Sequence, residues 1–365
     1  MVECADVKGE LFARLERLAP EAILATNTSS LSVTALAAGL ARPERFAGLH
    51  FFNPAPIMKL VEVVAGARTD PAIAARLLDA ARAWGKHAVL ARDVPGFIVN
   101  RLARPFYGEG WRALEEGVGA PEAIDWALKA AGGFRMGPLE LGDLIGHDVN
   151  SAVARSIFEA YFGRTRFTPS LAQGQLVASG RFGRKTGGGV YGPEGPAAPA
   201  FLAEGPGGEA ALVVEGDGRS AAAVAAERGQ PVCVLDWARP ESDIVVFMAS
   251  DEAAAAAGAR HAAARGKKAL RLADRPGGLV LRTWAQLANA AADALRDRVA
   301  SRADLDAALV FGVNYPIGPL AWAEALGAAK LVAVLDAIAR ETGEAMYAPG
   351  EVLRRWAVTK GEPDA

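Results

Sequence analysis

The chain has 365 residues, of which 51% are hydrophobic and 22% are charged, and its formal net charge is −2. This length predicts two or three domains that each bury a core of their own. The balanced charge argues against a nucleic-acid-binding protein, which carries a basic stripe. Two cysteines, Cys4 and Cys233, are too few and too far apart for a disulfide framework or a zinc ribbon, so we predict no metal site.

The first residues form an acidic amphipathic stretch without the apolar centre of a signal peptide. The chain also contains no uncharged apolar run of about 18 residues, so we expect no membrane span. A cytoplasmic protein without a membrane partner is the prediction that follows.

Helix and strand patterns alternate over the first part of the chain. Helical spacing of apolar residues predicts helices over 7–18 and 71–85, and short apolar runs predict strands over 22–26, 45–52, 59–64 and 86–91. Strands separated by helix-length segments are typical of an α/β sheet that is largely parallel.

The pattern changes after Pro95 and Gly96, because long helical periods then run from 97 to about 159. The glycine-rich segment 180–189 lacks the spacing of a phosphate-binding loop, and we interpret it as a tight turn. The stretch 192–209 is rich in proline, glycine and glutamate, which is typical of a linker.

The last part of the chain repeats the helical part. Segment 95–101 resembles 276–282, and segment 137–143 resembles 318–324. The prolines of these two motifs, Pro95 and Pro138 in the first copy and Pro276 and Pro319 in the second, are 43 residues apart in both copies. Equal spacing of two separate motifs predicts a duplicated helical domain.

A short α/β pattern precedes the second copy. A predicted strand over 210–215 leads into a GxGxxA turn at 216–221, and Asp236 ends a second strand over 231–236. Glycines at this spacing, followed by an acid, are a weak signal for a dinucleotide site. Only one further strand, over 242–248, precedes the helices, so we favour a shrunken structural relic over a working nucleotide site.

His50 and Glu62 are the first candidates for chemistry. His50 lies near the end of one strand pattern, and Glu62 lies inside the next, where a lone carboxylate is costly unless it has a partner. If the two strands are neighbours, Glu62 contacts the imidazole, fixes its tautomer and raises its basicity. The alternative is a core histidine bonded to a backbone carbonyl, with Glu62 facing solvent from an edge strand.

Ser29 and Asn100 are further candidates. Ser29 follows the strand over 22–26, at the end where α/β sheets bind ligands, although the same residues suit a turn that caps a helix. Asn100 lies in an apolar stretch, where its amide needs a partner such as a thioester or carboxyl oxygen. The second copy has Leu281 at the matching position, so the fold itself does not require the amide.

Five segments carry a family resemblance: 27–31, 47–54, 58–63, 93–101 and 136–140. In this order they resemble the L-3-hydroxyacyl-CoA dehydrogenase family from about Glu3 to Tyr191. The remainder resembles the second helical domain of longer, duplicated members of the 3-hydroxybutyryl-CoA or phenylacetate-pathway type. The resemblance implies a Rossmann domain, a helical domain, and oxidation of a 3-hydroxyacyl-CoA by NAD.

The resemblance also implies roles for individual residues. His50 corresponds to the catalytic base, Glu62 to its orienting partner, Ser29 to a serine that bonds the substrate oxygen, and Asn100 to an asparagine near the acyl thioester. The positions that correspond to contacts with the nicotinamide half of NAD are Glu3, Lys8 and Asn27.

Four segments follow from these observations. We expect the C-terminal part of a Rossmann domain over 1–93, a helical domain over 94–192, a linker with a degenerate Rossmann-like segment over 193–274, and a second helical domain over 275–357. Since family members dimerise through their helical domains, we expect a homo-oligomer or a pseudo-dimer within one chain.

The family opens with a strand, a GxGxxG turn and a helix, and Met1 corresponds to a position beyond them. We therefore expect an N-terminally truncated member, and two interpretations remain open. One is an NAD-dependent dehydrogenase whose missing part lies upstream in the gene. The other is a non-catalytic or partner-dependent fragment that is retained for assembly. For the polypeptide as given, we expect little NADH formation with 3-hydroxybutyryl-CoA.

Overall fold

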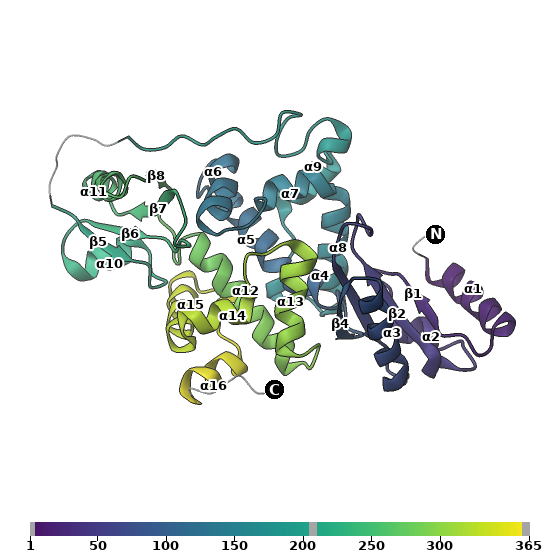
Figure 1. Ribbon diagram of the computed structural model, residues 1–365. Coiled ribbons are helices and arrows are strands. Elements are labelled where there is room, and N and C mark those ends of the chain that lie inside the picture. The colour runs from purple at the N-terminus through teal and green to yellow at the C-terminus, as the bar shows by residue number, and fades with distance from the viewer. Residues whose placement is uncertain (1–3, 204–209, 360–365) are drawn as a thin grey trace. The chain divides into compact units, whose positions relative to one another are not determined.

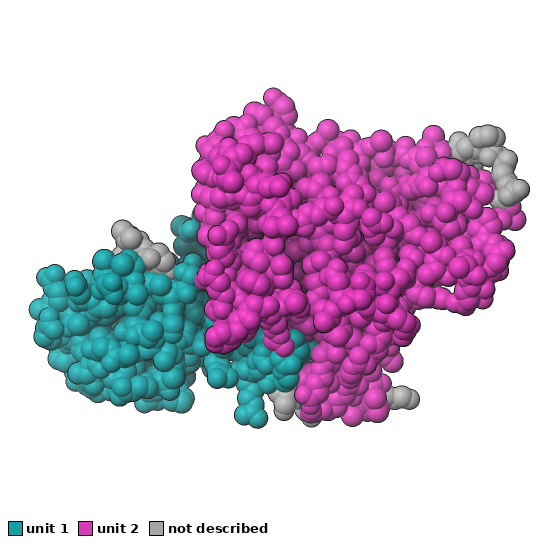
Figure 2. Space-filling model, turned by 180° about the vertical axis from the view of Figure 1, so that it is seen from behind, with its two compact units in different colours: residues 1–103, 291–321, 364–365 teal, residues 104–290, 322–363 magenta. Residues whose placement is uncertain are grey.

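The computed structural model describes residues 4–203 and 210–359. The described residues form two compact units, which are coloured separately in Figure 2. Unit 1 contains residues 4–103 and 291–321, and unit 2 contains residues 104–203, 210–290 and 322–359.

Unit 1 is built on a four-stranded sheet. Its strands lie in the order of the sequence: β1 (Leu24–Thr26), β2 (Phe46–Phe51), β3 (Leu60–Ala65) and β4 (His87–Arg92). The β1–β2 and β3–β4 pairs are parallel, whereas β2 and β3 are antiparallel. A connection of eight residues, 52–59, joins β2 to β3 and is too short for a parallel crossover. The predicted α/β class is confirmed, with one antiparallel pair in the sheet.

Helices cover this sheet (Figure 1). Those of the N-terminal segment are α1 (Ala5–Leu18), α2 (Val33–Ala37), α3 (Pro71–Ala83), α4 (Val99–Leu102) and the short 3-10 helix η1 (Pro43–Arg45). Helix α3 begins after Asp70, whose carboxylate accepts the N–H of Ala72, with a proline in the first turn. Its apolar face packs on the sheet in a core that includes Leu49, Val61, Val63, Ile73, Leu77 and Ala88.

A helix from the second copy also packs on this sheet. Helix α13 (Arg302–Val313) contacts β3, β4 and α4 within unit 1. A Cβ atom at Gly312 would lie 2.6 Å from Leu60, so glycine permits this close approach. The ring of Phe311 stacks on His87 with 4.2 Å between the ring centroids.

Unit 2 contains most of the helices. The first copy contributes α5 (Arg104–Glu115), α6 (Pro121–Trp126), the π-helix η2 (Ala127–Ala131), α7 (Pro138–Ile145), α8 (His147–Ala160), η3 (Thr165–Phe167), α9 (Leu171–Ala178) and η4 (Arg184–Thr186). The second copy contributes α15 (Ala328–Thr342), η5 (Ala345–Tyr347) and α16 (Glu351–Thr359), while α12 (Val280–Arg296) and α14 (Pro319–Leu326) run through both units.

A second sheet in unit 2 has the topology of the first. Its strands are β5 (Leu212–Glu215), β6 (Val232–Leu235), β7 (Ile244–Ala249) and β8 (Lys268–Arg271), with α10 (Ala221–Arg228) and α11 (Glu252–Ala263) as its helices. The pairs are again parallel, antiparallel and parallel. The duplication therefore includes this sheet as well as the helices.

Matching hydrogen bonds support the duplication. The Asp125 carboxylate accepts the N–H groups of Leu139 and Glu140. In the second copy, the Asp306 carboxylate accepts those of Leu320 and Ala321, and each of these residues lies 181 positions after its counterpart. No helix in the described part of the chain is long and apolar enough to span a membrane.

Candidate active site

His50 and Glu62 face each other across the β2–β3 pair. They are register partners, and Nδ1 of His50 lies 2.6 Å from Oε2 of Glu62. Glu62 is 0% exposed and His50 is 5% exposed. A solvent-facing Glu62 on an edge strand, the alternative from the sequence, is wrong because β3 is an inner strand of the sheet.

The second oxygen of Glu62 is bonded to backbone. Oε1 accepts the N–H of Ile98 at 3.1 Å and that of Val99 at 2.9 Å. These two donors, together with the imidazole, satisfy a carboxylate that is otherwise costly to bury. Because Glu62 accepts a hydrogen bond from Nδ1, the neutral ring of His50 carries its proton there and Nε2 has a free lone pair.

Two phenylalanine rings surround the imidazole. The ring of Phe52 is tilted against His50 with a centroid separation of 4.5 Å, and the ring of Phe97 meets it edge-on at 5.7 Å. Phe97 is 2% exposed and has a positive φ of 46°. The two rings restrict the orientation of the imidazole and limit its contact with water.

The other predicted site residues lie on the loop after β1 and at the start of α4. Nδ2 of Asn100 lies 3.5 Å from the backbone oxygen of Ser29, and Ser29 is exposed. Oδ1 of Asn27 accepts the N–H of Phe51, which is next to His50. This arrangement brings Asn27, Ser29 and Asn100 to the carboxyl ends of β1 and β2, where α/β sheets bind ligands.

Lys8 supports the same loop from α1. Its side chain is buried, and Nζ donates to the backbone oxygen of Asn27 at 2.8 Å. Glu3, the remaining predicted cofactor contact, lies outside the described residues. The structure thus brings six of the seven predicted site residues into unit 1.

The second copy lacks this chemistry. The strand register matches the positions of the two sheets. Glu62 of β3 is the register partner of Val89 of β4, and in the second sheet Val246 of β7 is the register partner of Leu270 of β8. The N–H of Asp236 donates to the oxygen of Val246, so Asp236 holds the sheet position of His50 and Val246 that of Glu62.

The GxGxxA turn of the second sheet does not fit a dinucleotide. The N–H groups of Ala221 and Ala222 are bonded to Asp274, and Gly218 packs against the backbone of Val334. Asp236 is buried and accepts N–H groups at the start of α12, so it does not face a ribose hydroxyl. The interpretation of this segment as a structural relic stays a prediction.

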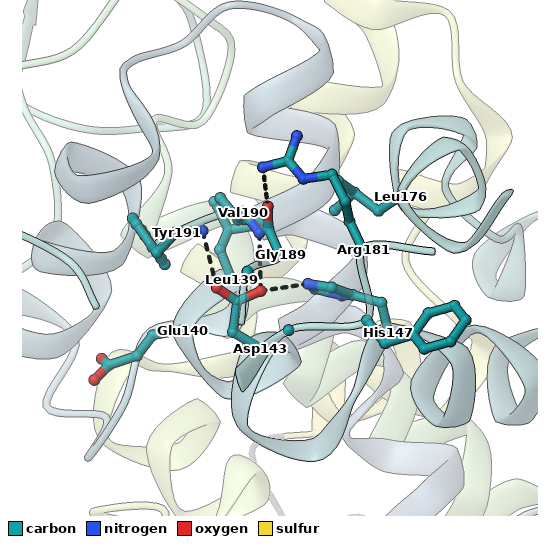
Figure 3. Close-up of polar contacts among 12 residues, drawn as sticks. Leu139, Glu140, Asp143, His147, Leu176, Arg181, Gly189, Val190 and Tyr191 are labelled. Atoms are coloured by element: carbon teal, nitrogen blue, oxygen red, sulfur yellow. Dashed lines mark hydrogen bonds and ion pairs between the residues drawn. The ribbon is translucent and has the colours of Figure 1, made fainter. Parts of the chain in front are cut away.

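A second buried His–Asp pair, not identified from the sequence, lies in unit 2. Nε2 of His147 on α8 lies 2.6 Å from Oδ1 of Asp143 on α7, and the same carboxylate accepts the N–H groups of Val190 and Tyr191 (Figure 3). The other ring nitrogen of His147 lies 3.3 Å from Nε2 of Gln173, and the imidazole is 0% exposed. The pair therefore joins α7 and α8 to the segment at Val190 and Tyr191 and does not face a ligand.

The glycine-rich segment 180–189 is the tight turn predicted from the sequence. Gly183 and Gly188 exchange backbone hydrogen bonds, and a side chain at Gly189 would overlap the Asp143 carboxylate. No group of three or more histidine, cysteine or acidic side chains suited to a metal ion occurs among residues 4–203 and 210–359.

Comparisons with known proteins fit this geometry. The model of the 3-hydroxyacyl-CoA dehydrogenase NAD-binding domain matches residues 1–94, and the model of the C-terminal domain of the same enzymes matches residues 96–192 and 277–362. The chain belongs to the 3-hydroxyacyl-CoA dehydrogenase family. It oxidises a 3-hydroxyacyl-CoA with NAD as its cofactor, and acyl-CoA is its class of substrate.

Similar proteins match over different lengths. The 3-hydroxyadipyl-CoA dehydrogenase of Escherichia coli K12 is 44% identical over 98% of this chain and 79% of its own length. A crystal structure of 3-hydroxybutyryl-CoA dehydrogenase from Escherichia coli K12 has a TM-score of 0.92 with 43% identity, and covers 98% of this chain and 80% of that one. The mitochondrial hydroxyacyl-coenzyme A dehydrogenase of Sus scrofa is 47% identical over 52% of this chain and 61% of its own length. The chain thus spans about four-fifths of the length of the first two proteins and about three-fifths of the third.

Proposed function

We propose that His50 is the general base of this dehydrogenase. The observation that carries the proposal is the 2.6 Å contact between His50 Nδ1 and Glu62 Oε2. This contact leaves Nε2 to accept the proton of the substrate 3-hydroxyl group. When NAD is bound, it supplies the acceptor for the hydride that leaves C3 of the substrate.

Glu62 stabilises the charge that His50 acquires. Proton transfer to Nε2 creates an imidazolium next to a buried carboxylate, and Ile98 and Val99 hold that carboxylate in place through their N–H groups. A preorganised negative charge of this kind favours the transition state without reorganisation. Glu62 therefore acts as an orienting and stabilising partner of the base.

Ser29 and Asn100 are proposed to orient the substrate. The exposed Ser29 hydroxyl suits a hydrogen bond to the reacting oxygen, and the Asn100 amide suits a bond to the thioester carbonyl. The 3.5 Å contact between Asn100 Nδ2 and the Ser29 backbone oxygen supports their assignment to one site. Two such contacts hold C3 of the substrate in a fixed position relative to His50.

Asn27 and Lys8 are proposed to hold the nicotinamide half of NAD. Asn27 uses its side-chain oxygen on the N–H of Phe51, so its exposed NH2 group is the part that suits a cofactor oxygen. Lys8 holds the Asn27 backbone in place through the hydrogen bond from its Nζ to the Asn27 carbonyl oxygen. The role of Glu3 remains a prediction from the sequence.

The acyl group is proposed to be short. Support comes from two relatives that match nearly the whole chain and are named for 3-hydroxyadipyl-CoA and 3-hydroxybutyryl-CoA. The phenylacetate pathway remains a prediction from the sequence. The cytoplasmic location also remains a prediction from the sequence.

The test is a His50→Gln variant assayed for NADH formation with each of these two substrates. Loss of a general base lowers kcat by roughly 10²- to 10⁴-fold. His87→Gln is the matched control, because His87 is exposed and stacks on Phe311. A His50→Gln variant with turnover close to that of the wild type would refute the proposal.

We also propose that the two copies dock on each other within one chain as a pseudo-dimer. Arg101 pairs with Asp297 in unit 1, and Arg282 pairs with Glu116 in unit 2. Arg282 lies 181 positions after Arg101, and Asp297 lies 181 positions after Glu116. Each arginine thus bonds to an acid of the other copy.

Backbone bonds repeat the same exchange. The N–H of Arg92 donates to the oxygen of Val299, and the N–H of Ala273 donates to the oxygen of Val118, both at 2.8 Å. The predicted division at 1–93, 94–192, 193–274 and 275–357 is retained with this proposal. Sedimentation equilibrium tests it: a 38.0 kDa monomer is expected, and an obligate dimer of chains would contradict it.

A further inference from the structure

Residue 97 has a backbone conformation that suits glycine, yet it is a phenylalanine. Phe97 has a φ of 46° and follows Gly96, which has a φ of 79°. In the left-handed region a Cβ atom crowds the neighbouring carbonyl, so a bulky side chain there is an outlier. Outliers of this kind persist where the surrounding structure gains something from them.

The second copy shows what the fold itself requires at this position. Gly277 and Gly278 have φ angles of 79° and 60°, and they lie 181 positions after Gly96 and Phe97. Both copies therefore need two successive left-handed residues before the first helix of the helical domain. Glycine meets this need without steric conflict in the second copy, so the first copy has a phenylalanine for another reason.

The side chain of Phe97 contacts the proposed base. Its ring meets the His50 imidazole at an interplanar angle of 63°, and Phe52 packs on the same imidazole. In the second copy, a Cβ atom at Gly278 would lie 2.7 Å from the carboxylate of Asp236, which holds the sheet position of His50. In the first copy, phenylalanine at position 97 thus accompanies histidine at position 50. In the second copy, glycine at position 278 accompanies aspartate at position 236.

We infer that Phe97 is a positioning residue that holds the His50 imidazole against Glu62. The inference rests on the proposed function of His50. Ile98 and Val99, which follow Phe97 directly, bind Glu62 through their N–H groups. One short segment therefore fixes both members of the pair: its backbone holds the carboxylate, and its first side chain limits rotation of the ring.

Apolar burial by itself makes a different prediction. If Phe97 only fills space, Phe97→Leu keeps an apolar side chain in the site and leaves the His50–Glu62 bond intact. If the aromatic ring positions the imidazole, Phe97→Leu weakens that bond even though the protein stays folded. Phe97→Gly gives the second test, because it introduces the residue that the second copy uses.

Nuclear magnetic resonance of protein labelled with ¹⁵N-histidine reports the bond directly. Of the four histidines, His50 and His147 each form a 2.6 Å contact with a carboxylate, so two strongly downfield ring N–H signals are expected. Glu62→Gln removes the His50 signal and thereby assigns it. Both Phe97 variants are expected to lose or broaden that signal and to keep the His147 signal, which serves as the internal control for folding.

Steady-state kinetics give the second readout. A misplaced base lowers kcat on the order of 10²-fold, whereas KM is expected to stay within about 3-fold because the Phe97 side chain is buried behind the imidazole. Phe247→Leu is the matched control, since Phe247 is fully buried in the second sheet. It is expected to lower stability and to leave both the His50 signal and kcat unchanged.

An unchanged His50 signal and an unchanged kcat in Phe97→Leu would overturn the inference. The resonance experiment does not depend on turnover, so it tests the positioning of the ring even if His50→Gln keeps its activity. Retained activity in His50→Gln would refute the proposed function of His50 but not the positioning of its ring by Phe97.

Discussion

Nδ1 of His50 lies 2.6 Å from Oε2 of Glu62, and the two residues are direct partners across the antiparallel β2–β3 pair. The strand pairing fixes the separation of their backbones, and the bonds from Ile98 and Val99 fix the carboxylate. The proposed acid–base pair is therefore held by the sheet on one side and by the start of the helical segment on the other.

Glu62→Gln is expected to lower kcat by roughly 10²- to 10⁴-fold, because a neutral amide does not stabilise the imidazolium that forms on His50. KM for the CoA ester should change little, since Glu62 contacts Nδ1 of the imidazole, whereas the substrate is proposed to meet Nε2. Initial rates of NADH formation measure both constants. A variant with more than half of the wild-type kcat would show that the charge of Glu62 is not needed.

Asn100→Leu introduces the residue that the second copy has at the matching position, Leu281. Loss of an orienting hydrogen bond to the thioester carbonyl should lower kcat by roughly 10²-fold, because the reacting carbon is then misplaced. The free energy of unfolding should change little, because Leu281 occupies this helical position in the second copy. Initial rates and urea unfolding of the same preparation separate the two effects. A loss of kcat that is accompanied by a clear fall in the free energy of unfolding would indicate a structural role for Asn100 instead.

Asp236→Asn tests the acid of the second copy. Its carboxylate accepts the N–H groups of Trp237, Leu279, Val280 and Leu281 at 2.7–2.9 Å. An amide accepts fewer of these bonds, so the free energy of unfolding should fall by about 1–3 kcal/mol. NADH formation by the folded protein should be unchanged. A strong loss of turnover without loss of stability would instead assign Asp236 to the chemistry.

Asp125 should make stability depend on pH. Burial raises the pKa of its carboxyl group to about 6 from the ordinary 3.8, despite hydrogen bonds from Leu139, Tyr191 and Glu140. Between these two values the folded state binds more protons than the unfolded state, so this group lowers the free energy of unfolding as pH rises. The loss is about 3 kcal/mol and is complete above about pH 6.

The comparison with Asp125→Asn isolates this effect, because asparagine does not titrate. Urea unfolding at several values between about pH 3 and pH 7 should show the wild type losing about 3 kcal/mol relative to the variant. A constant difference across this range would place the pKa of Asp125 at its ordinary value.

Arg282→Met should destabilise the protein strongly. Arg282 is 1% exposed, and its guanidinium lies 2.7 Å from Glu109, whose side chain is also 1% exposed. Loss of the cation breaks this buried ion pair and leaves the Glu109 carboxylate with a hydrogen bond from the neutral Tyr347 hydroxyl, which costs about 3–5 kcal/mol. The double variant with Glu109→Gln should recover part of this loss in urea unfolding. A single variant that loses less than about 1 kcal/mol would indicate that the pair contributes little.

Much of the α/β part could be predicted from local patterns. The strands at 22–26, 45–52, 59–64 and 86–91 match β1 to β4 to within a few residues, because apolar runs bounded by turns have few other structures available. The contact between His50 and Glu62 was one of two alternatives from the sequence, and the short connection between their strands, which keeps β2 and β3 adjacent, makes it possible.

Other features had no local signal. The positive φ of Phe97 is invisible in a sequence that offers an ordinary apolar residue there. Asp236 resembled the acid of a dinucleotide site by spacing, but it binds the N–H groups of residues more than forty positions later. The Asp143–His147 pair acquires its role only when the turn after residue 180 folds back onto α7.

The sequence by itself determined the family and the duplication, and it supplied the two residues of the proposed acid–base pair, because these depend on motifs and on short spacings. Only the tertiary structure decided which charged groups meet. Arg101 and Asp297 are separated by 196 positions, and Arg282 and Glu116 by 166. No local sequence preference selects such partners. Burial selects them, because an arginine side chain removed from water is stable only if a carboxylate from another part of the chain pairs with it.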